Sequence, residues 1–155
     1  IPIELRPLMG NRIYGCDDCQ LICPWNKFAK LGAEVDFQAR EQLDETSLLN
    51  LFSWDEETFL KKTEGSPIRR IGFECWQRNI SVALGNAPFD ENIVSALTNK
   101  KNTSTSLVLE HIEWALEQHS QKQKSAELNI PLKQENERLT GRLIRSIEKG
   151  LPRDA

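Results

Sequence analysis

Three of the four cysteines lie within one run of eight residues, and this cluster limits what the chain can fold into more than any other feature. Cys16, Cys19 and Cys23 follow the pattern C-x2-C-x3-C, and Pro24 comes directly after the last of them. Thiolates at this spacing on a tight loop can bind soft metal centres, and the proline is typical of bacterial ferredoxin runs. One cysteine of the ferredoxin run C-x2-C-x2-C-x3-C-P is absent, however. Either the missing ligands lie elsewhere, or the loop is not an iron–sulfur site.

The composition favours metal binding over disulfide formation. Four cysteines in 155 residues, three of them clustered, do not form a disulfide framework and indicate metal ligands in a reducing compartment. No apolar run is long enough to cross a bilayer and no signal peptide precedes the cysteines, so we expect a cytoplasmic location. The net charge of −3 gives no general attraction to nucleic acid, so a basic binding site would have to be local. Because the chain opens at Ile1 rather than at a methionine, we expect it to be a fragment.

The first 15 residues predict an irregular lead-in, because they contain two prolines and two glycines. Arg6 and Arg12 in this segment either pair with Glu4 and Asp17, remain solvated, or bind phosphate. After Trp25 we expect one short helical turn and then a linker, with a module boundary near residue 33.

From about residue 44 the pattern becomes helical. Ser53 or Asp55 can cap a helix that has carboxylates in its first turn and should end at Gly65. Ser66 and Pro67 are typical of the start of another helix, which should stop at 85–88. Its apolar face predicts a buried side. The polar residues expected on the opposite, exposed side are Arg69, Arg70, Glu74, Gln77, Arg78 and Ser81.

Further helices are expected over residues 89–99 and 104–119, followed by a polar linker over 120–131 and a mostly charged tail helix over 132–150. Short helices joined by Gly/Pro/Asn turns indicate stacked helical hairpins of the HEAT type, although no strict internal repeat is present. The tryptophans are expected as core anchors, with the alternative that an exposed Trp25 packs between two modules.

Two long strings resemble one enzyme family. ELRPLMGNRIYGCDDCQLICPWN and GSPIRRIGFECWQRNISVALGNAP, followed by EHIEWAL, resemble the C-terminal part of the bacterial epoxyqueuosine reductases, iron–sulfur and cobalamin dependent enzymes that complete queuosine synthesis in tRNA. The resemblance covers roughly residues 1–118. It implies a mainly α chain with the end of a ferredoxin-like [4Fe-4S] module (1–33) and a HEAT-like tRNA-binding domain (34–119). The linker and tail helix expected over 120–155 lie outside the resemblance.

The resemblance also implies how the cysteines act. Cys16 and Cys19 would complete one [4Fe-4S] cluster while Cys23 crosses to the other, and the remaining ligands would lie upstream, so that neither cluster forms on this chain alone. Inert buried cysteines and a zinc knuckle are the alternatives. Cys75 is interpreted as a small core hydrophobe. His111 and His119 have no partners at zinc spacing, and we expect them in ordinary surface roles.

A carboxylate and a basic stretch are the other candidate contacts. Asp17 either caps the following turn or accepts hydrogen bonds from the amide groups of a neighbouring corrin. Residues 61–78 carry five cations against two carboxylates, a local balance of +3. On one helix Arg70, Glu74 and Arg78 would share a face that binds phosphate, unless Glu74 pairs with both arginines. The residues predicted to contact tRNA are Arg12, Lys61, Arg69, Arg70 and Arg78.

The implied activity is reduction of epoxyqueuosine to queuosine at the tRNA wobble position, with loss of water. Electrons from an unidentified donor would reach cobalamin through the two clusters, in a monomeric enzyme without membrane contact. This fragment would supply cluster ligands and contacts to the tRNA. It would contain no catalytic acid and would be inactive alone. Two alternatives remain: a ferredoxin-type electron-transfer module fused to a helical protein-interaction scaffold, and a zinc-stabilised binding domain without redox activity.

Overall fold

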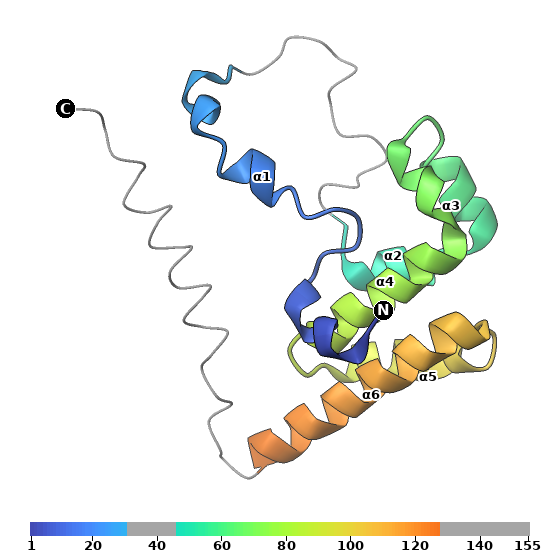
Figure 1. Cartoon of the computed structure of the whole chain (residues 1–155). Helices are drawn as coiled ribbons and strands as arrows, with labels where there is room; N and C mark the ends of the chain where they lie inside the picture. The colour runs from blue at the N-terminus through green and yellow to red at the C-terminus, as the bar shows by residue number, and fades with distance from the viewer. Residues whose placement is uncertain (31–45, 128–155) are drawn as a thin grey trace. The chain divides into compact units, whose positions relative to one another are not determined.

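A computed structural model of the chain describes residues 1–30 and 46–127, and every regular element in these residues is helical (Figure 1). The mainly α class is therefore confirmed. In chain order the elements, with η marking 3-10 turns, are η1 (Ile3–Leu5), η2 (Pro7–Met9), α1 (Asp18–Leu21), η3 (Pro24–Phe28), α2 (Leu48–Ser53), α3 (Glu56–Lys62), η5 (Pro67–Ile71), α4 (Gly72–Asn86), α5 (Glu91–Lys101) and α6 (Ser106–Glu127).

The chain divides into two units, Ile1–Ser120 and Gln121–Ala155. The first contains all the elements down to most of α6, and its residues 46–120 are called the helical body below. Of the second unit the structure describes only residues 121–127, which are helical. The expected boundary near residue 33 and the tail helix over 132–150 lie outside the described residues. None of the described helices is both long enough and apolar enough to cross a membrane.

Local capping begins the first helices of the body as the sequence predicts. The Ser47 hydroxyl accepts a hydrogen bond from the Asn50 amide (3.2 Å) at the start of α2, and the Asp55 carboxylate accepts one from the Thr58 amide (2.8 Å) at the start of α3. Each bond satisfies an amide that has no partner within its helix. The cap at Asp55 is confirmed, whereas Ser53 is the last residue of α2.

The single helix predicted to start at Ser66 is wrong, because the chain forms two elements there. The Ser66 hydroxyl does accept from the Ile68 amide (3.3 Å), and Pro67 is the first residue of a 3-10 turn. That turn ends at Ile71, and Gly72 then adopts φ +74°, a conformation that glycine enters without steric cost. Arg70 therefore lies before the break, outside the helical register that the sequence pattern assigned to it.

The core of the helical body forms around α4. Trp76 stacks on Trp54 with ring centroids 5.9 Å apart and lies 5.5 Å from Phe59, which joins α2, α3 and α4 through one aromatic cluster. Trp114 of α6 is also buried, so three of the four tryptophans are core anchors as expected. The buried hydrophobic residues are Leu51, Phe52, Trp54, Phe59, Trp76, Ile80, Val82, Ala83, Leu84, Ile93, Leu97, Val108, Ile112, Trp114 and Ala115.

Gln77 and Ser81 correct the predicted polar face of α4. Both are buried, because neighbouring elements cover α4 on more than its apolar side. The Gln77 amide donates to the Trp54 carbonyl (3.2 Å), and the Ser81 hydroxyl donates to the Gln77 carbonyl (2.8 Å). These bonds satisfy the donor groups of both side chains, whereas the Gln77 side-chain oxygen is buried and has no hydrogen-bond partner among the described residues.

Gly85 lies inside the last turn of α4, where the helix approaches α6. A Cβ atom at this position would lie 2.6 Å from a ring carbon of Trp114 and 2.9 Å from the Cα atom of Ala115. Gly85 therefore permits the close packing of α4 against α6. The helix was predicted to stop at residues 85–88, and α4 does end at Asn86.

The last two helices end later than predicted, and α6 is also longer than predicted. Asp90 caps α5 by accepting from the Asn92 amide (2.7 Å), and α5 continues to Lys101. α6 continues to Glu127, so the linker predicted to begin at residue 120 is wrong for residues 120–127. These residues contain no glycine or proline, and most are good helix formers.

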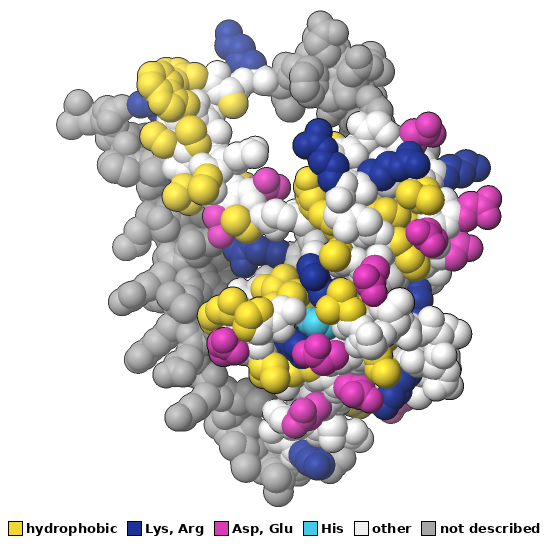
Figure 2. Space-filling model, turned by 45° about the vertical axis from the view of Figure 1, so that its right-hand side comes forward, with side chains coloured by type: hydrophobic (Ala, Val, Ile, Leu, Met, Phe, Trp, Pro, Cys, Tyr) yellow, Lys and Arg dark blue, Asp and Glu magenta, His cyan; other side chains and the backbone are white. Residues whose placement is uncertain are grey.

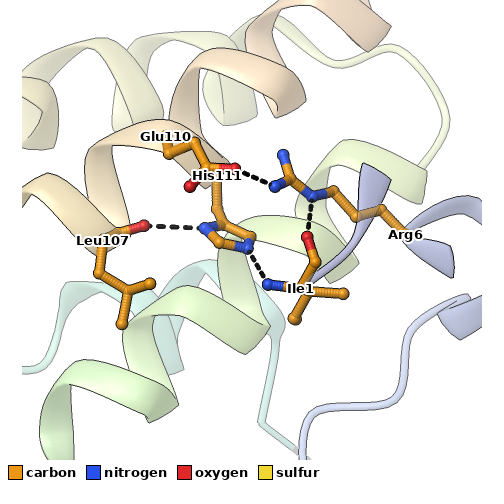
Figure 3. A network of polar contacts seen from close by, with 5 residues as sticks. All are labelled: Ile1, Arg6, Leu107, Glu110 and His111. Carbon is orange, nitrogen blue, oxygen red and sulfur yellow. Dashed lines mark hydrogen bonds and ion pairs between the residues drawn. The ribbon is translucent and has the colours of Figure 1, made fainter. Parts of the chain in front are cut away.

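The lead-in, defined here as residues 1–14, is irregular apart from two 3-10 turns, as predicted, and it packs on the helical body. Arg6 is only 2% exposed. Its guanidinium donates to the Glu110 carboxylate and to the Ile1 carbonyl (2.9 Å; Figure 3). It also lies 5.8 Å from the centre of the Trp114 ring. The predicted pairing with Glu4, and a phosphate contact, are both wrong for Arg6, because its partner comes from α6.

Both histidines are buried, so the expected surface roles are wrong. His111 Nδ1 lies 2.8 Å from the Leu107 carbonyl, which can only accept, so Nδ1 carries the proton and Nε2 accepts from the Ile1 nitrogen (3.0 Å; Figure 3). Burial lowers the pKa of His111, and the nearby Arg6 guanidinium adds to this effect. His119 Nε2 lies 2.9 Å from the Leu84 carbonyl.

Candidate functional site

The cysteine loop, residues 15–26, folds around one short helix. Gly15 (φ +64°) and Asp17 (φ +51°) take left-handed conformations directly before α1, and the Asp17 carbonyl accepts from the Gln20 amide (2.8 Å) and the Leu21 amide (2.9 Å). After α1, the Asn26 side chain donates to the Gln20 carbonyl (2.6 Å) and closes the loop. The cysteines thus sit before, within and after a tight turn of helix.

All three loop cysteines are free thiols, with Cys16 and Cys19 exposed and Cys23 half-buried. Their thiolate chemistry and accessibility fit a soft metal centre. Within the described residues, no group of three or more potential metal-ligating side chains converges. The loop therefore fits as part of a ligand set for a metal group, since an iron–sulfur cluster needs four such ligands. Cys75 lies apart from the loop, half-buried on α4.

The contacts of the two loop carboxylates, Asp17 and Asp18, differ from those that the sequence predicts. The Asp17 side chain makes no capping bond, because its left-handed backbone leaves the cap to the carbonyl, so the predicted cap by this side chain is wrong. Arg12 instead pairs with the neighbouring Asp18, with one guanidinium nitrogen 2.9 Å and 3.1 Å from the two carboxylate oxygens. The carboxylate of Asp17 remains exposed.

Large apolar side chains surround the loop on the surface. Trp25 is 72% exposed and Phe28 62%, their ring centroids lie 5.5 Å apart, and Leu21 and Ile22 are similarly exposed. Figure 2 shows hydrophobic side chains gathered at the upper left. Pro24, Trp25, Lys27 and Phe28 line a hollow of about 300 Å³. Trp25 is thus the exception to the expected core role.

The basic residues predicted to bind tRNA do not all behave alike. Lys61, Arg69 and Arg70, together called the basic turn, are exposed, and no ion pair joins them to another described residue. Figure 2 shows dark blue side chains grouped at the upper right. Glu74 accepts from the Thr105 hydroxyl (2.5 Å), so the alternative in which it pairs with both Arg70 and Arg78 is wrong.

Arg78 differs from the basic turn because it is half-buried and engaged. Its Nε and Nη2 atoms donate to the Asn79 side-chain oxygen at 3.1 Å and 3.0 Å. Arg12, as described above, is held by Asp18. The structure therefore brings Arg69 and Arg70 together in one turn and gives Arg12 and Arg78 partners elsewhere.

Three residues that the sequence interpretation missed hold segments together. Asn86 donates to the carbonyls of Arg6 (2.8 Å) and Gly10 (3.0 Å), and Asn79 donates to the Ile13 carbonyl (2.8 Å). Lys100 donates to the carbonyls at the end of α2, and desolvation lowers its pKa. Asparagine is a poor helix former, so the presence of two asparagines seven residues apart on one helix was the signal that could have identified these contacts.

Comparison with known proteins identifies relatives for the whole chain. It is 57% identical to the epoxyqueuosine reductase of Escherichia coli K12 over 157 residues, which cover all of this chain and 39% of that protein. It is also 57% identical to the Yersinia pestis protein of the same name, covering 36% of it, and 58% identical to the Xanthomonas campestris one over 119 residues. The chain thus spans less than two fifths of the length of these relatives. No family model matches it, and no solved structure is significantly similar.

Proposed function

We propose, from the homology of the whole chain to one part of the epoxyqueuosine reductases, that it works within an enzyme that reduces epoxyqueuosine to queuosine in tRNA. The observation that carries the proposal is the identity of more than half of all positions in an alignment that spans the full chain. In this proposal the chain contributes ligands for iron–sulfur clusters and contacts to the RNA.

Cys16 and Cys19 would hold one [4Fe-4S] cluster and Cys23 the other, with the further ligands supplied from outside the described residues. The exposure of Cys16 and Cys19 and the tight turn between them support this assignment. When bound, the clusters and cobalamin supply the electrons for the reduction. The exposed carboxylate of Asp17 is suited to accept hydrogen bonds from the amide groups of a corrin beside the loop.

The basic turn would contact the phosphates of the RNA, on a helical body that we take to be of the HEAT type. Arg69 and Arg70 are exposed, adjacent and unopposed by a described carboxylate, and arginine binds phosphate through a bidentate fork. Lys61, at the end of α3, would add a third positive charge.

Anaerobic iron–sulfur reconstitution tests the metal assignment in a protein of the relatives' full length that contains this chain. Absorption typical of [4Fe-4S] clusters together with a bound corrinoid is expected. Clusters without a corrinoid would favour an electron-transfer module, and a colourless zinc protein would favour a zinc-stabilised domain. Cys23→Ala should damage the cluster opposite to the one damaged by Cys16→Ala, because the thiolate before the proline crosses over.

The RNA contact is tested by measuring tRNA affinity over a series of salt concentrations. Arg69→Glu and Arg70→Glu should each weaken binding and reduce the slope of log K against log salt by about one. Lys124→Glu, the same charge reversal at an exposed site on α6, serves as the matched control. Equal affinity and slope in all variants would refute the contact.

A further inference from the structure

Side chains of α4 bind the backbone of the lead-in. Asn86 binds the carbonyls of Arg6 and Gly10, and Asn79 binds the carbonyl of Ile13. Because the two asparagines are seven residues apart, they lie on one face of α4, separated by about 10 Å. Two side chains of one helix therefore hold the lead-in at successive points as it approaches the cysteine loop.

Arg78 determines which way the Asn79 amide points. A guanidinium can only donate hydrogen bonds, so the side-chain atom of Asn79 that receives both Arg78 contacts has to be its oxygen. The nitrogen is then turned toward the Ile13 carbonyl, 2.8 Å away. Arg78 thus acts through Asn79 on the lead-in.

The fastening ends directly before the loop. Tyr14, the last residue of the lead-in, also contacts the helical body: its hydroxyl donates to the Pro67 carbonyl (3.2 Å) at the start of the 3-10 turn that carries Arg69 and Arg70. Gly15 follows with a left-handed backbone, and Cys16 comes next. Only a few residues, spanning less than about 10 Å when extended, separate the Asn79 contact from the first cysteine.

We propose that Asn79 and Asn86 are positioning residues that set the place at which the cysteine loop leaves the helical body, with Arg78 orienting Asn79. The inference rests on the proposed function, in which Cys16 has to meet a cluster shared with ligands from elsewhere. Ligand constellations of this kind have to be held within about half an ångström by their supporting contacts. A displaced lead-in would move Cys16 directly.

Asn79 offers variants that separate positioning from a general structural role. Alanine is a better helix former than asparagine, so Asn79→Ala and Asn86→Ala should leave α4 intact while removing the donors. Asn79→Asp keeps the contact with Arg78 but turns a carboxylate oxygen, instead of an N–H group, toward the Ile13 carbonyl. Asn92→Ala, at an exposed position of α5 whose side chain makes no hydrogen bond to a described residue, is the control.

Hydrogen–deuterium exchange of the 155-residue chain, free of metal, gives the first readout. Exchange in peptides covering residues 6–16 should rise about fivefold in the Asn79→Ala and Asn86→Ala variants, the factor expected for loss of one ordinary hydrogen bond. Asn79→Asp should have at least the same effect, whereas the control should match the unmodified chain. Circular dichroism confirms that each variant retains its helices. Unchanged exchange in the Asn79 and Asn86 variants would overturn the inference.

The second readout uses the protein of full relative length, reconstituted with iron. The Asn79 variants should change the electron paramagnetic resonance spectrum of the reduced clusters and lower kcat while leaving KM for tRNA unchanged. Faster exchange with an unchanged spectrum and unchanged kcat would overturn the positioning role. If no protein, the control included, holds clusters, then the proposed function fails, and the exchange result still decides whether these residues fix the lead-in.

Discussion

Replacing Gly85 with alanine would test the contact between α4 and α6. The added methyl group would lie 2.6 Å from a ring carbon of Trp114, 2.9 Å from the Cα atom of Ala115 and 3.0 Å from its Cβ atom. Carbon atoms that are not bonded to each other pack at about 3.5–4.0 Å. One of the three neighbours belongs to the backbone of α6, which cannot rotate away, so that the two helices would have to move apart.

The free energy of unfolding should fall by about 2 kcal/mol. Overpacking a core costs typically about 1–3 kcal/mol, and the two contacts below 3.0 Å place this change at the upper end of that range. Alanine is favoured over glycine in a helix by about 1 kcal/mol, which offsets part of the cost. Helix propensity alone predicts that Gly85→Ala stabilises the chain, so a decrease in the free energy of unfolding would have to come from the contact between α4 and α6.

Urea denaturation, followed by circular dichroism, measures this difference. The urea concentration at the midpoint of unfolding should fall, while the slope of the unfolding free energy against urea concentration stays the same, as expected for a change confined to the folded state. Ser95→Ala, on the exposed side of α5, provides a control in which only helix propensity changes, and it should stabilise the chain slightly. A Gly85→Ala variant as stable as the unmodified chain would refute the close approach of α4 and α6.

Three further changes test other parts of the structure. Asp55→Ala should lower the melting temperature by removing the cap of α3. The bond to Thr58 lowers the pKa of Asp55 below 3.8, so this decrease in melting temperature should be present above that pH and vanish in acid. Asp55→Asn, which can still cap the helix, should keep most of the stability and remove its pH dependence. Burial lowers the pKa of His111 below 6.5, so as the pH falls the unfolded chain binds a proton at this residue before the folded chain does. The stability of the fold should therefore be fully present above about pH 6.5 and decline below it. His111→Gln should reduce this decline when denaturation midpoints are compared at two pH values. Cys75→Ala should leave the iron content and turnover of the reconstituted full-length protein unchanged, and loss of iron would contradict the ligand assignment.

Features governed by neighbouring residues could be predicted from the sequence. Asp55 caps α3 because its partner, Thr58, is three residues away, and the stop of α4 depends on Pro88 shortly after it. The cysteine pattern is equally local. By contrast, the break at Gly72 depends on a backbone conformation that glycine permits but does not require.

Features that depend on contacts between distant residues could not be predicted in this way. Arg6 is buried because Glu110 and Trp114, more than 100 residues later, form its site. Gln77 and Ser81 looked like surface residues because the helical pattern of α4 does not reveal how many elements cover it. Arg78, assigned to RNA from its charge and its helical spacing with Arg70, contacts the adjacent Asn79, a partner that neither charge nor helical spacing indicates.

The two ways in which the lead-in is held have different consequences for its evolution. Asn79 and Asn86 bind backbone carbonyls, which every amino acid presents, so these hydrogen bonds place no demand on the side chains at positions 10 and 13. Other features constrain those positions, because Gly10 has φ +60° and Ile13 packs against the core. Arg6 and Glu110 recognise each other through their side chains, and a change in one leaves the other uncompensated. A chimaera that combines the lead-in of one relative with the helical body of another would therefore have to inherit this pair together, whereas the asparagine contacts would not depend on the side chains of the lead-in.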